Sequence, residues 1–170
     1  MFERYQFDLD AYVQRVRTES CFVCAIVSRD PDFPDHHVFY EDDAAIAFLN
    51  GYPTQYGYTL VAPKDHREQV AGDFTLREYL RLQRVVHRVA EAVREEVGAE
   101  RVYLLSLGSN EGNAHVHWHI VPLPPGTPYE EQQFAALMLE RAGVLKIREE
   151  EMEFLAARLG RRMERIDFGR

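Results

Sequence analysis

Long hydrophobic runs and a basic leader are both missing from this sequence of 170 residues. No stretch approaches the roughly 18 consecutive apolar residues that a membrane-spanning helix requires. The chain begins Met-Phe-Glu-Arg-Tyr-Gln-Phe-Asp, with acidic groups where a signal peptide has basic residues and an apolar run. We therefore expect a cytoplasmic protein that has no membrane partner.

Positive charge is also scarce. The chain has 20 Lys and Arg residues against 28 Asp and Glu residues, which gives a formal net charge of −8. A surface of that sign disfavours nucleic acid and anionic lipid, because both are bound by displacing counterions with Lys and Arg. We expect no nucleic-acid partner, and any polyanion that binds must be held at a local site. With 46% hydrophobic residues, the chain has enough apolar material for one ordinary core.

Cysteine is nearly absent. The two cysteines of the chain form the segment Cys21-Phe-Val-Cys24. In a reducing compartment, such a pair indicates metal ligands or a redox couple before it indicates a structural disulfide. Two small buried core residues are the plainer alternative for this spacing.

Periodic apolar residues predict two helices in the first hundred residues. The spacing favours a short amphipathic helix over residues 8–17, which Asp8 can cap. The segment Thr75-Leu-Arg-Glu78 has the form of a capping box, and the helical stripe after it runs for about six turns to Gly98. This long stripe can serve either the core or an interface between subunits.

Short apolar runs predict strands on both sides of the long helix. Segments 38–40, 44–49 and 58–62 precede it as a meander, and segments 101–107 and 115–121 follow it as a hairpin. We expect Pro122 to end the last strand. This order of elements fits an α+β fold with an antiparallel sheet of about five strands.

Three histidines alternate with apolar residues in His115-Val-His117-Trp-His119-Ile-Val-Pro122. Because strand side chains alternate between faces, the imidazoles point to one face and the apolar residues between them point to the other. Such a row suits metal ligation. It also suits catalysis at phosphorus, in which one neutral imidazole attacks while its neighbour donates to the phosphoryl oxygens. Of the other histidines, we expect His36 and His37 to be exposed in a loop, and His87 to be a packing or surface residue.

The histidine row resembles the signature of the histidine triad (HIT) family of nucleotide hydrolases and transferases, which is His-φ-His-φ-His-φ-φ with φ apolar. Residues 115–121 match it at all seven positions. The resemblance extends to earlier segments and covers roughly residues 20–123: Cys21-Phe-Val-Cys24, Phe48-Leu-Asn50, residues 57–66 and Ser109-Asn-Glu-Gly112. It implies a HIT-like fold, with a catalytic domain over residues 1–125 and a C-terminal helical extension over residues 126–170. In the extension, segments 129–141 and 148–162 have helical patterns, and we expect it to pack near the active site or to extend a dimer interface.

The resemblance assigns the catalytic roles. It implies that His117 attacks the α-phosphorus to form a nucleotidyl-histidine intermediate, which then passes its nucleotidyl group to water. His119 is the residue that would contact the α-phosphate oxygens.

Three asparagines are implied as substrate-binding residues. Asn50 matches the position that faces the ribose hydroxyls, and Asn110 matches an asparagine near the scissile phosphate. Asn113 is the polar residue left in a loop that is shorter than usual for the family. Tyr58 also departs from the family, which more often has a Gly-His pair there, so the leaving-group preference stays open.

The resemblance further implies a structural zinc ion. Bacterial members with a Cys-x-x-Cys segment bind zinc through residues that correspond to Cys21, Cys24, His66 and His115. Such a set is closed and tetrahedral, and it would tie the N-terminal region to the sheet.

We therefore expect an enzyme that cleaves at the α-phosphate of an adenosine phosphoramidate, an adenylate conjugate or a dinucleoside polyphosphate. The alternatives are a dinucleoside polyphosphate phosphorylase or nucleotidyl transferase, a non-catalytic nucleotide-binding module, and a zinc hydrolase that uses the histidine row as catalytic ligands. Members of the family are usually homodimers, so we expect a homodimer here.

Overall fold

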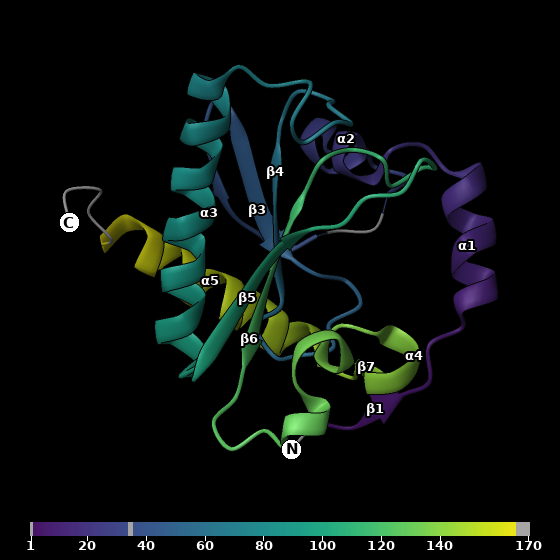
Figure 1. The fold of residues 1–170 in the computed structure, drawn as a ribbon, viewed down its shortest axis with the longest axis vertical. Coiled ribbons are helices and arrows are strands. Elements are labelled where there is room, and N and C mark those ends of the chain that lie inside the picture. The colour runs from purple at the N-terminus through teal and green to yellow at the C-terminus, as the bar shows by residue number, and fades with distance from the viewer. Residues whose placement is uncertain (1, 34–35, 166–170) are drawn as a thin grey trace.

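The computed structural model describes residues 2–33 and 36–165 (Figure 1). Its centre is a five-stranded sheet with the order β2-β3-β4-β6-β5, in which every neighbouring pair is antiparallel. The strands are β2 (Val38–Glu41), β3 (Ala45–Leu49), β4 (Thr59–Pro63), β5 (Arg101–Ser106) and β6 (Trp118–Leu123). The α+β fold expected from the sequence is confirmed.

Helices cover both sides of this sheet. In Figure 1, α3 (Leu76–Val97) and α5 (Glu149–Arg165) lie on one side. On the other side α2 (Phe22–Ser28) lies close to the sheet, and α1 (Leu9–Thr18) lies farther out. No helix in the described ranges combines the length and the apolar composition needed to cross a membrane.

The long helix α3 has both of the expected end signals. The Thr75 hydroxyl accepts the Glu78 backbone N–H, while the Glu78 carboxylate accepts the Thr75 backbone N–H at 2.7 Å, which completes a capping box. Gly98 follows the helix with φ at +66°, the left-handed conformation that favours glycine. At the shorter helix α1, the Asp8 carboxylate accepts the Ala11 N–H at 3.0 Å, as its capping role requires.

Strand alternation gives the sheet two apolar faces. The face beneath α3 and α5 carries buried residues from three segments: Ala45, Ala47, Leu49, Val61, Val116, Trp118 and Ile120. The face toward α2 carries the residues between them: Ile46, Phe48, Leu60, Ala62 and Val121. The side chains that α5 adds to the first face include Leu155 and Leu159, both fully buried. Each stabilises the fold by roughly 2 kcal/mol through burial of apolar surface.

The C-terminal extension differs from the expected pair of helices. Helix α5 corresponds to the helix predicted over residues 148–162. Residues 129–141, however, form no single helix. They form two 3-10 turns, η1 (Tyr129–Glu131) and η2 (Gln133–Ala136), and the start of the short helix α4 (Leu139–Ala142). Gln133 has φ at +56°, which no continuous right-handed helix allows.

Two further elements were not predicted. Helix α2 occupies the segment around the cysteines, and a two-stranded ribbon pairs β1 (Arg4–Tyr5) with β7 (Val144–Leu145). The ribbon joins the N-terminal segment to the part of the C-terminal extension that precedes α5. Because α5 shares the main core and this ribbon ties the extension to the N-terminus, the extension packs as part of one body with the sheet.

Candidate functional site

The histidine row divides between the two faces of the sheet as expected. Val116, Trp118 and Ile120 belong to the core under α3 and α5, and the imidazoles lie on the α2 side. His115 and His117 are 0% and 4% exposed. The regular strand begins only at Trp118, and before it the Val116 N–H donates to the Arg67 carbonyl at 2.6 Å. The first two histidines therefore precede the strand. The expectation that Pro122 ends this strand is wrong, because the pairing with β5 continues to Leu123.

His117 is held as a neutral imidazole with one free nitrogen. Its Nδ1 lies 2.7 Å from the His115 carbonyl oxygen, and since a carbonyl can only accept, Nδ1 carries the proton. Burial lowers the pKa of His117, which keeps the ring neutral near pH 7. The Ser106 hydroxyl donates to the His117 carbonyl at 2.8 Å and fixes the backbone. This arrangement leaves the Nε2 lone pair available.

His119 lies beside His117, with the ring centroids 4.8 Å apart. Its Nε2 is 3.2 Å from the Leu107 carbonyl oxygen, and its Nδ1 is 2.7 Å from the Tyr58 hydroxyl. Burial and the neighbouring His117 lower the pKa of His119 to about 4. The site therefore presents two neutral imidazoles side by side.

Four of the predicted residues converge on one point. One ligand atom from each of Cys21, Cys24, His66 and His115 lies within 4.8 Å of all the others. The Cys21 Sγ is 3.4 Å from the His115 Nδ1, and the Cys24 Sγ is 3.3 Å from the His66 Nδ1. In tetrahedral zinc coordination, bonds of about 2.3 Å to sulfur and about 2.0 Å to nitrogen place the two atoms roughly 3.5 Å apart. The observed spacing fits such an ion.

The outer nitrogens of both histidines also fit metal ligation. The His115 Nε2 lies 2.9 Å from the Pro63 carbonyl oxygen, and the His66 Nε2 lies 3.0 Å from a Glu68 carboxylate oxygen. Each acceptor holds the proton on Nε2 and leaves the Nδ1 lone pair facing the cysteines. Burial and Cys21 raise the pKa of Cys24 to about 11, and a bound divalent cation would offset that rise by favouring the thiolate.

The three asparagines are distributed unevenly around the histidines. Asn50 follows β3; its side chain accepts the Tyr52 N–H at 2.8 Å and also interacts with the Tyr58 hydroxyl. Asn113 accepts the Ser109 hydroxyl and interacts with Tyr12 of α1. Asn110 is exposed in the loop before the histidine row. Contacts therefore link Asn50 to His119 through Tyr58, whereas Asn113 faces α1.

Aromatic residues that sequence reasoning did not single out lie on one side of His117. The Phe22 ring meets the His117 ring edge-on, with the ring centroids 5.4 Å apart. Phe22 also meets the Phe48 ring edge-on, with the centroids 6.4 Å apart. His36 stacks on Phe33 at 5.3 Å and meets Phe48 edge-on at 5.8 Å. In the sequence, the one signal for this aromatic contact was the position of Phe22 inside the Cys-x-x-Cys segment. That position indicates a contact with His117 only once the segment is known to form helix α2.

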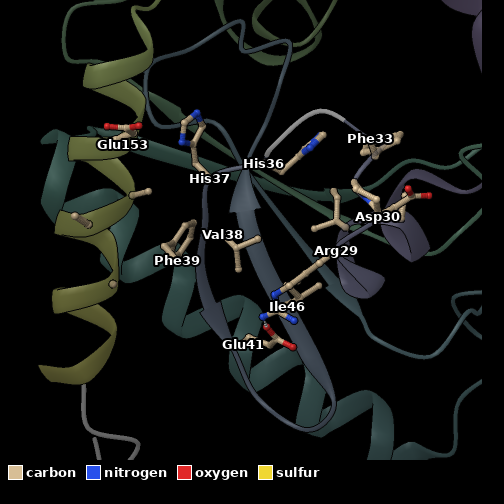
Figure 2. Close-up of a pocket in the computed structure, with 16 residues that line it drawn as sticks. Arg29, Asp30, Phe33, His36, His37, Val38, Phe39, Glu41, Ile46 and Glu153 are labelled. Carbon is tan, nitrogen blue, oxygen red and sulfur yellow. Dashed lines mark hydrogen bonds and ion pairs between the residues drawn. The ribbon is translucent and has the colours of Figure 1, made fainter.

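The expectation that His36 and His37 are exposed is wrong. Both are half-buried. The Nε2 of His37 lies 3.2 Å from a carboxylate oxygen of Glu149 in α5. The two histidines border a groove of about 810 Å³ between the α2 side and α5, with Phe33 beside His36 (Figure 2). His87 is exposed on α3.

The N-terminal helix borders the same site. The Gly112 N–H donates to the Val16 carbonyl at 3.0 Å, and a Cβ at Gly112 would lie 2.2 Å from that oxygen. Glycine is therefore required where α1 meets the loop before the histidine row. The Tyr12 ring packs edge-on against Tyr52 at 5.7 Å, so α1 forms a second aromatic boundary beside Asn50.

Comparisons with curated proteins give relatives that match about 60% of the chain. A protein named "Protein hit" from Bacillus subtilis is 36% identical over 109 residues, which are 61% of this chain and 71% of that protein. An uncharacterized HIT-like protein from Borreliella burgdorferi is 32% identical over 108 residues, 60% of this chain and 74% of its own.

Solved structures give the same relationship. A hypothetical histidine triad nucleotide-binding protein from Sulfolobus tokodaii has a TM-score of 0.67 at 28% identity, with 85% of this chain and 93% of that chain covered. A Zn-bound histidine triad family protein from Mycobacterium smegmatis has a TM-score of 0.61 at 26% identity, with 86% and 94% covered. Residues 33–125, more than half of the chain, match the HIT domain. On this match and on the alternating histidines of its sheet, the protein belongs to the histidine triad family.

Proposed function

We propose that this protein is a nucleotide hydrolase that cleaves at the α-phosphate of an adenosine phosphoramidate, an adenylate conjugate or a dinucleoside polyphosphate. The state of His117 is the observation that carries this proposal. Its Nδ1–H is held by the His115 carbonyl, and its ring is buried and neutral. A nucleophilic imidazole needs this combination of one fixed proton and one free lone pair.

The reaction follows in two displacements. The His117 Nε2 lone pair forms a bond to the α-phosphorus, and the bond from phosphorus to the leaving group breaks. The His119 Nε2–H donates to the α-phosphate oxygens as charge develops on them. The His117 ring is then cationic, and the His115 carbonyl stabilises its Nδ1–H. In the second step water attacks phosphorus and loses a proton to solvent, the N–P bond breaks, and a nucleoside monophosphate leaves.

The surrounding residues fit the rest of a nucleotide. Asn50 carries an amide that can both donate to and accept from the ribose hydroxyls. The rings of Phe22, Phe48, Phe33 and His36 form an apolar aromatic cluster on the α2 side of His117. We assign this cluster to the nucleobase, with Asn113 and Asn110 toward the leaving group.

We assign a structural zinc ion to Cys21, Cys24, His66 and His115. When bound, this ion supplies a closed tetrahedral cross-link between α2, the segment after β4 and the start of the histidine row. All four protein ligands are already provided, so the phosphoryl chemistry is assigned to the imidazoles. Two unpaired thiolate ligands are typical of a reducing compartment, and we propose that the protein lies in the cytoplasm.

Trapping the intermediate tests the proposal. Quenching in denaturant at alkaline pH, where the N–P bond to histidine survives, during turnover of adenosine 5′-phosphoramidate or a diadenosine polyphosphate is expected to give intact protein that carries one adenylyl group by mass spectrometry. A His117→Ala variant is expected to show no adduct, and His87→Ala, altered at an exposed position on α3, is expected to show the wild-type adduct. If neither wild type nor His117→Ala forms an adduct and both turn over equally slowly, the protein is a binding module.

The same samples separate hydrolase from phosphorylase. Turnover in water is expected to release adenosine monophosphate whether or not inorganic phosphate is present. Release of adenosine diphosphate only when phosphate is added would identify the phosphorylase, which uses the same intermediate with a different acceptor.

We further propose that a second copy of this chain pairs with the β5 edge of the sheet. β5 is the last strand in the sheet order, and Leu104 on it is 49% exposed. Leu76 and Leu80 of α3, which packs against β5, are 74% and 52% exposed. An exposed apolar residue on an open edge strand, with more on the helix that packs against that strand, is typical of a subunit interface.

A charge at this edge is expected to dissociate the dimer. Leu104→Glu should shift the sedimentation coefficient from that of a dimer to that of a monomer. Phe154→Glu changes a residue that is 64% exposed on α5 and should leave the coefficient unchanged. A dimer that survives Leu104→Glu would contradict an interface at β5.

A further inference from the structure

Tyr58 is buried beneath the histidine pair. It immediately precedes β4 and is 6% exposed. Its hydroxyl lies 2.7 Å from the Nδ1 of His119, and its ring meets the imidazole edge-on at 5.8 Å. The hydroxyl therefore contacts the nitrogen of His119 that is turned away from the substrate.

The partners of His119 define where its proton lies. The Leu107 carbonyl, 3.2 Å from Nε2, can only accept, so Nε2 carries hydrogen. In a neutral ring, Nδ1 then has a lone pair, and Tyr58 must donate to it. Both groups remain in these states near pH 7, because burial lowers the pKa of His119 to about 4 and raises the pKa of Tyr58.

Other contacts hold the Tyr58 hydroxyl in this position. The Tyr58 backbone accepts the Asn50 N–H at 2.9 Å and donates to the Gln55 carbonyl at 3.1 Å. The Asn50 side chain interacts with the hydroxyl itself. Gly57, just before it, has φ at +89°, and a Cβ there would lie 2.7 Å from a methyl carbon of Val97, so glycine is required at this turn.

We infer that Tyr58 is a positioning residue, which fixes His119 in the tautomer whose Nε2–H points at the phosphoryl oxygens of the substrate. This inference rests on the proposed function. A phosphoryl oxygen that replaces the Leu107 carbonyl takes over the Nε2–H, while the Tyr58 bond on the other nitrogen persists. With the opposite tautomer, His119 would present a lone pair to an anionic oxygen, and an attraction would become a repulsion.

The tautomer can be observed directly. Two-bond proton–nitrogen NMR spectra of the histidine rings are expected to show hydrogen on Nε2 of His119 in the wild-type protein. The signals of His119 are assigned by their disappearance in the His119→Gln variant. Tyr58→Phe removes only the hydroxyl and is expected to give a mixture of tautomers. The matched control is Tyr56→Phe, whose hydroxyl contacts Arg158 and Glu151 rather than the site.

Kinetics give the second measurement. Tyr58→Phe is expected to lower kcat roughly 10- to 30-fold with KM changed less than about twofold. The hydrogen bond that orients the donor is lost, whereas Asn50 loses its contact with the hydroxyl but keeps the Tyr52 N–H that holds its side chain. Tyr56→Phe is expected to keep the wild-type kcat. A change confined to KM would contradict a positioning role.

The outcomes separate this inference from the proposed function. Hydrogen on Nδ1 of wild-type His119, or an unchanged Nε2–H tautomer in Tyr58→Phe, overturns the inference whatever the activity is. An absent adenylyl adduct together with equal turnover by His117→Ala overturns the function instead. Thermal unfolding midpoints within a few degrees of wild type show that a loss of kcat in Tyr58→Phe does not come from unfolding.

Discussion

Replacing His117 with alanine is expected to reduce turnover of the adenosine phosphoramidate or dinucleotide substrate by about 10⁴-fold or more. The variant lacks the nucleophile, so the reaction must proceed by direct attack of water, and removal of a covalent nucleophile typically costs that much or more. Initial rates at saturating substrate measure the effect. Binding is expected to change much less, because Asn50 and the aromatic cluster are untouched.

His117 is buried, so its removal could also disturb the fold. His117→Gly with added imidazole separates the two effects, since a free imidazole in the vacated space is expected to restore part of the rate. His87→Ala provides a matched loss of one imidazole at an exposed position on α3. Wild-type rates in His117→Ala would remove the basis for covalent catalysis.

Features that depend on local chemistry were predictable from the sequence. The capping box at Thr75 and the helix end at Gly98 are each set by residues within about one helical turn of that end of α3. The division of the histidine row between two faces depends only on the period of an extended chain, and it holds even where the regular strand has not yet begun.

Features that depend on distant contacts were not predictable. Helix α2 has seven residues, too few for a periodic pattern, and it exists because its apolar side packs on the sheet. The β1–β7 ribbon pairs two residues with two others more than a hundred positions away. Tyr12 and Tyr52 reach the site by the same kind of long-range packing.

The site itself shows the same limit. The resemblance named the four proposed metal ligands and the two proposed catalytic histidines, because both sets lie in short motifs. The bond between Tyr58 and His119 joins residues 61 positions apart, and no motif contains both. In the sequence, Tyr58 stood out only as a departure from the family pattern. The structure shows that its hydroxyl contacts the Nδ1 of His119.

One residue connects the proposed metal site to the proposed nucleophile. The side chain of His115 faces the cysteines, and its carbonyl oxygen accepts the Nδ1–H of His117. The Pro63 carbonyl fixes the outer nitrogen of the same ring. Metal binding at His115 would therefore stabilise the backbone that sets the tautomer of His117.

Removing the metal is accordingly expected to lower stability before it lowers the rate. Purified protein should contain about one zinc ion per chain, and chelation should lower the thermal unfolding midpoint by about 10 °C or more, because a closed site ties three segments together. Well below the new midpoint, turnover should fall less than about tenfold, since zinc would hold His115 without touching the phosphate.

Variants on α2 test the same point. Cys24→Ser should reproduce the lowered midpoint and lose zinc, whereas Ser28→Ala at the end of the same helix should keep both zinc and the wild-type midpoint. Chelation that abolishes turnover while the unfolding midpoint stays unchanged would instead indicate a catalytic metal. The protein would then use its histidine row as ligands, and the carbonyl of His115 would lose its assigned role in catalysis.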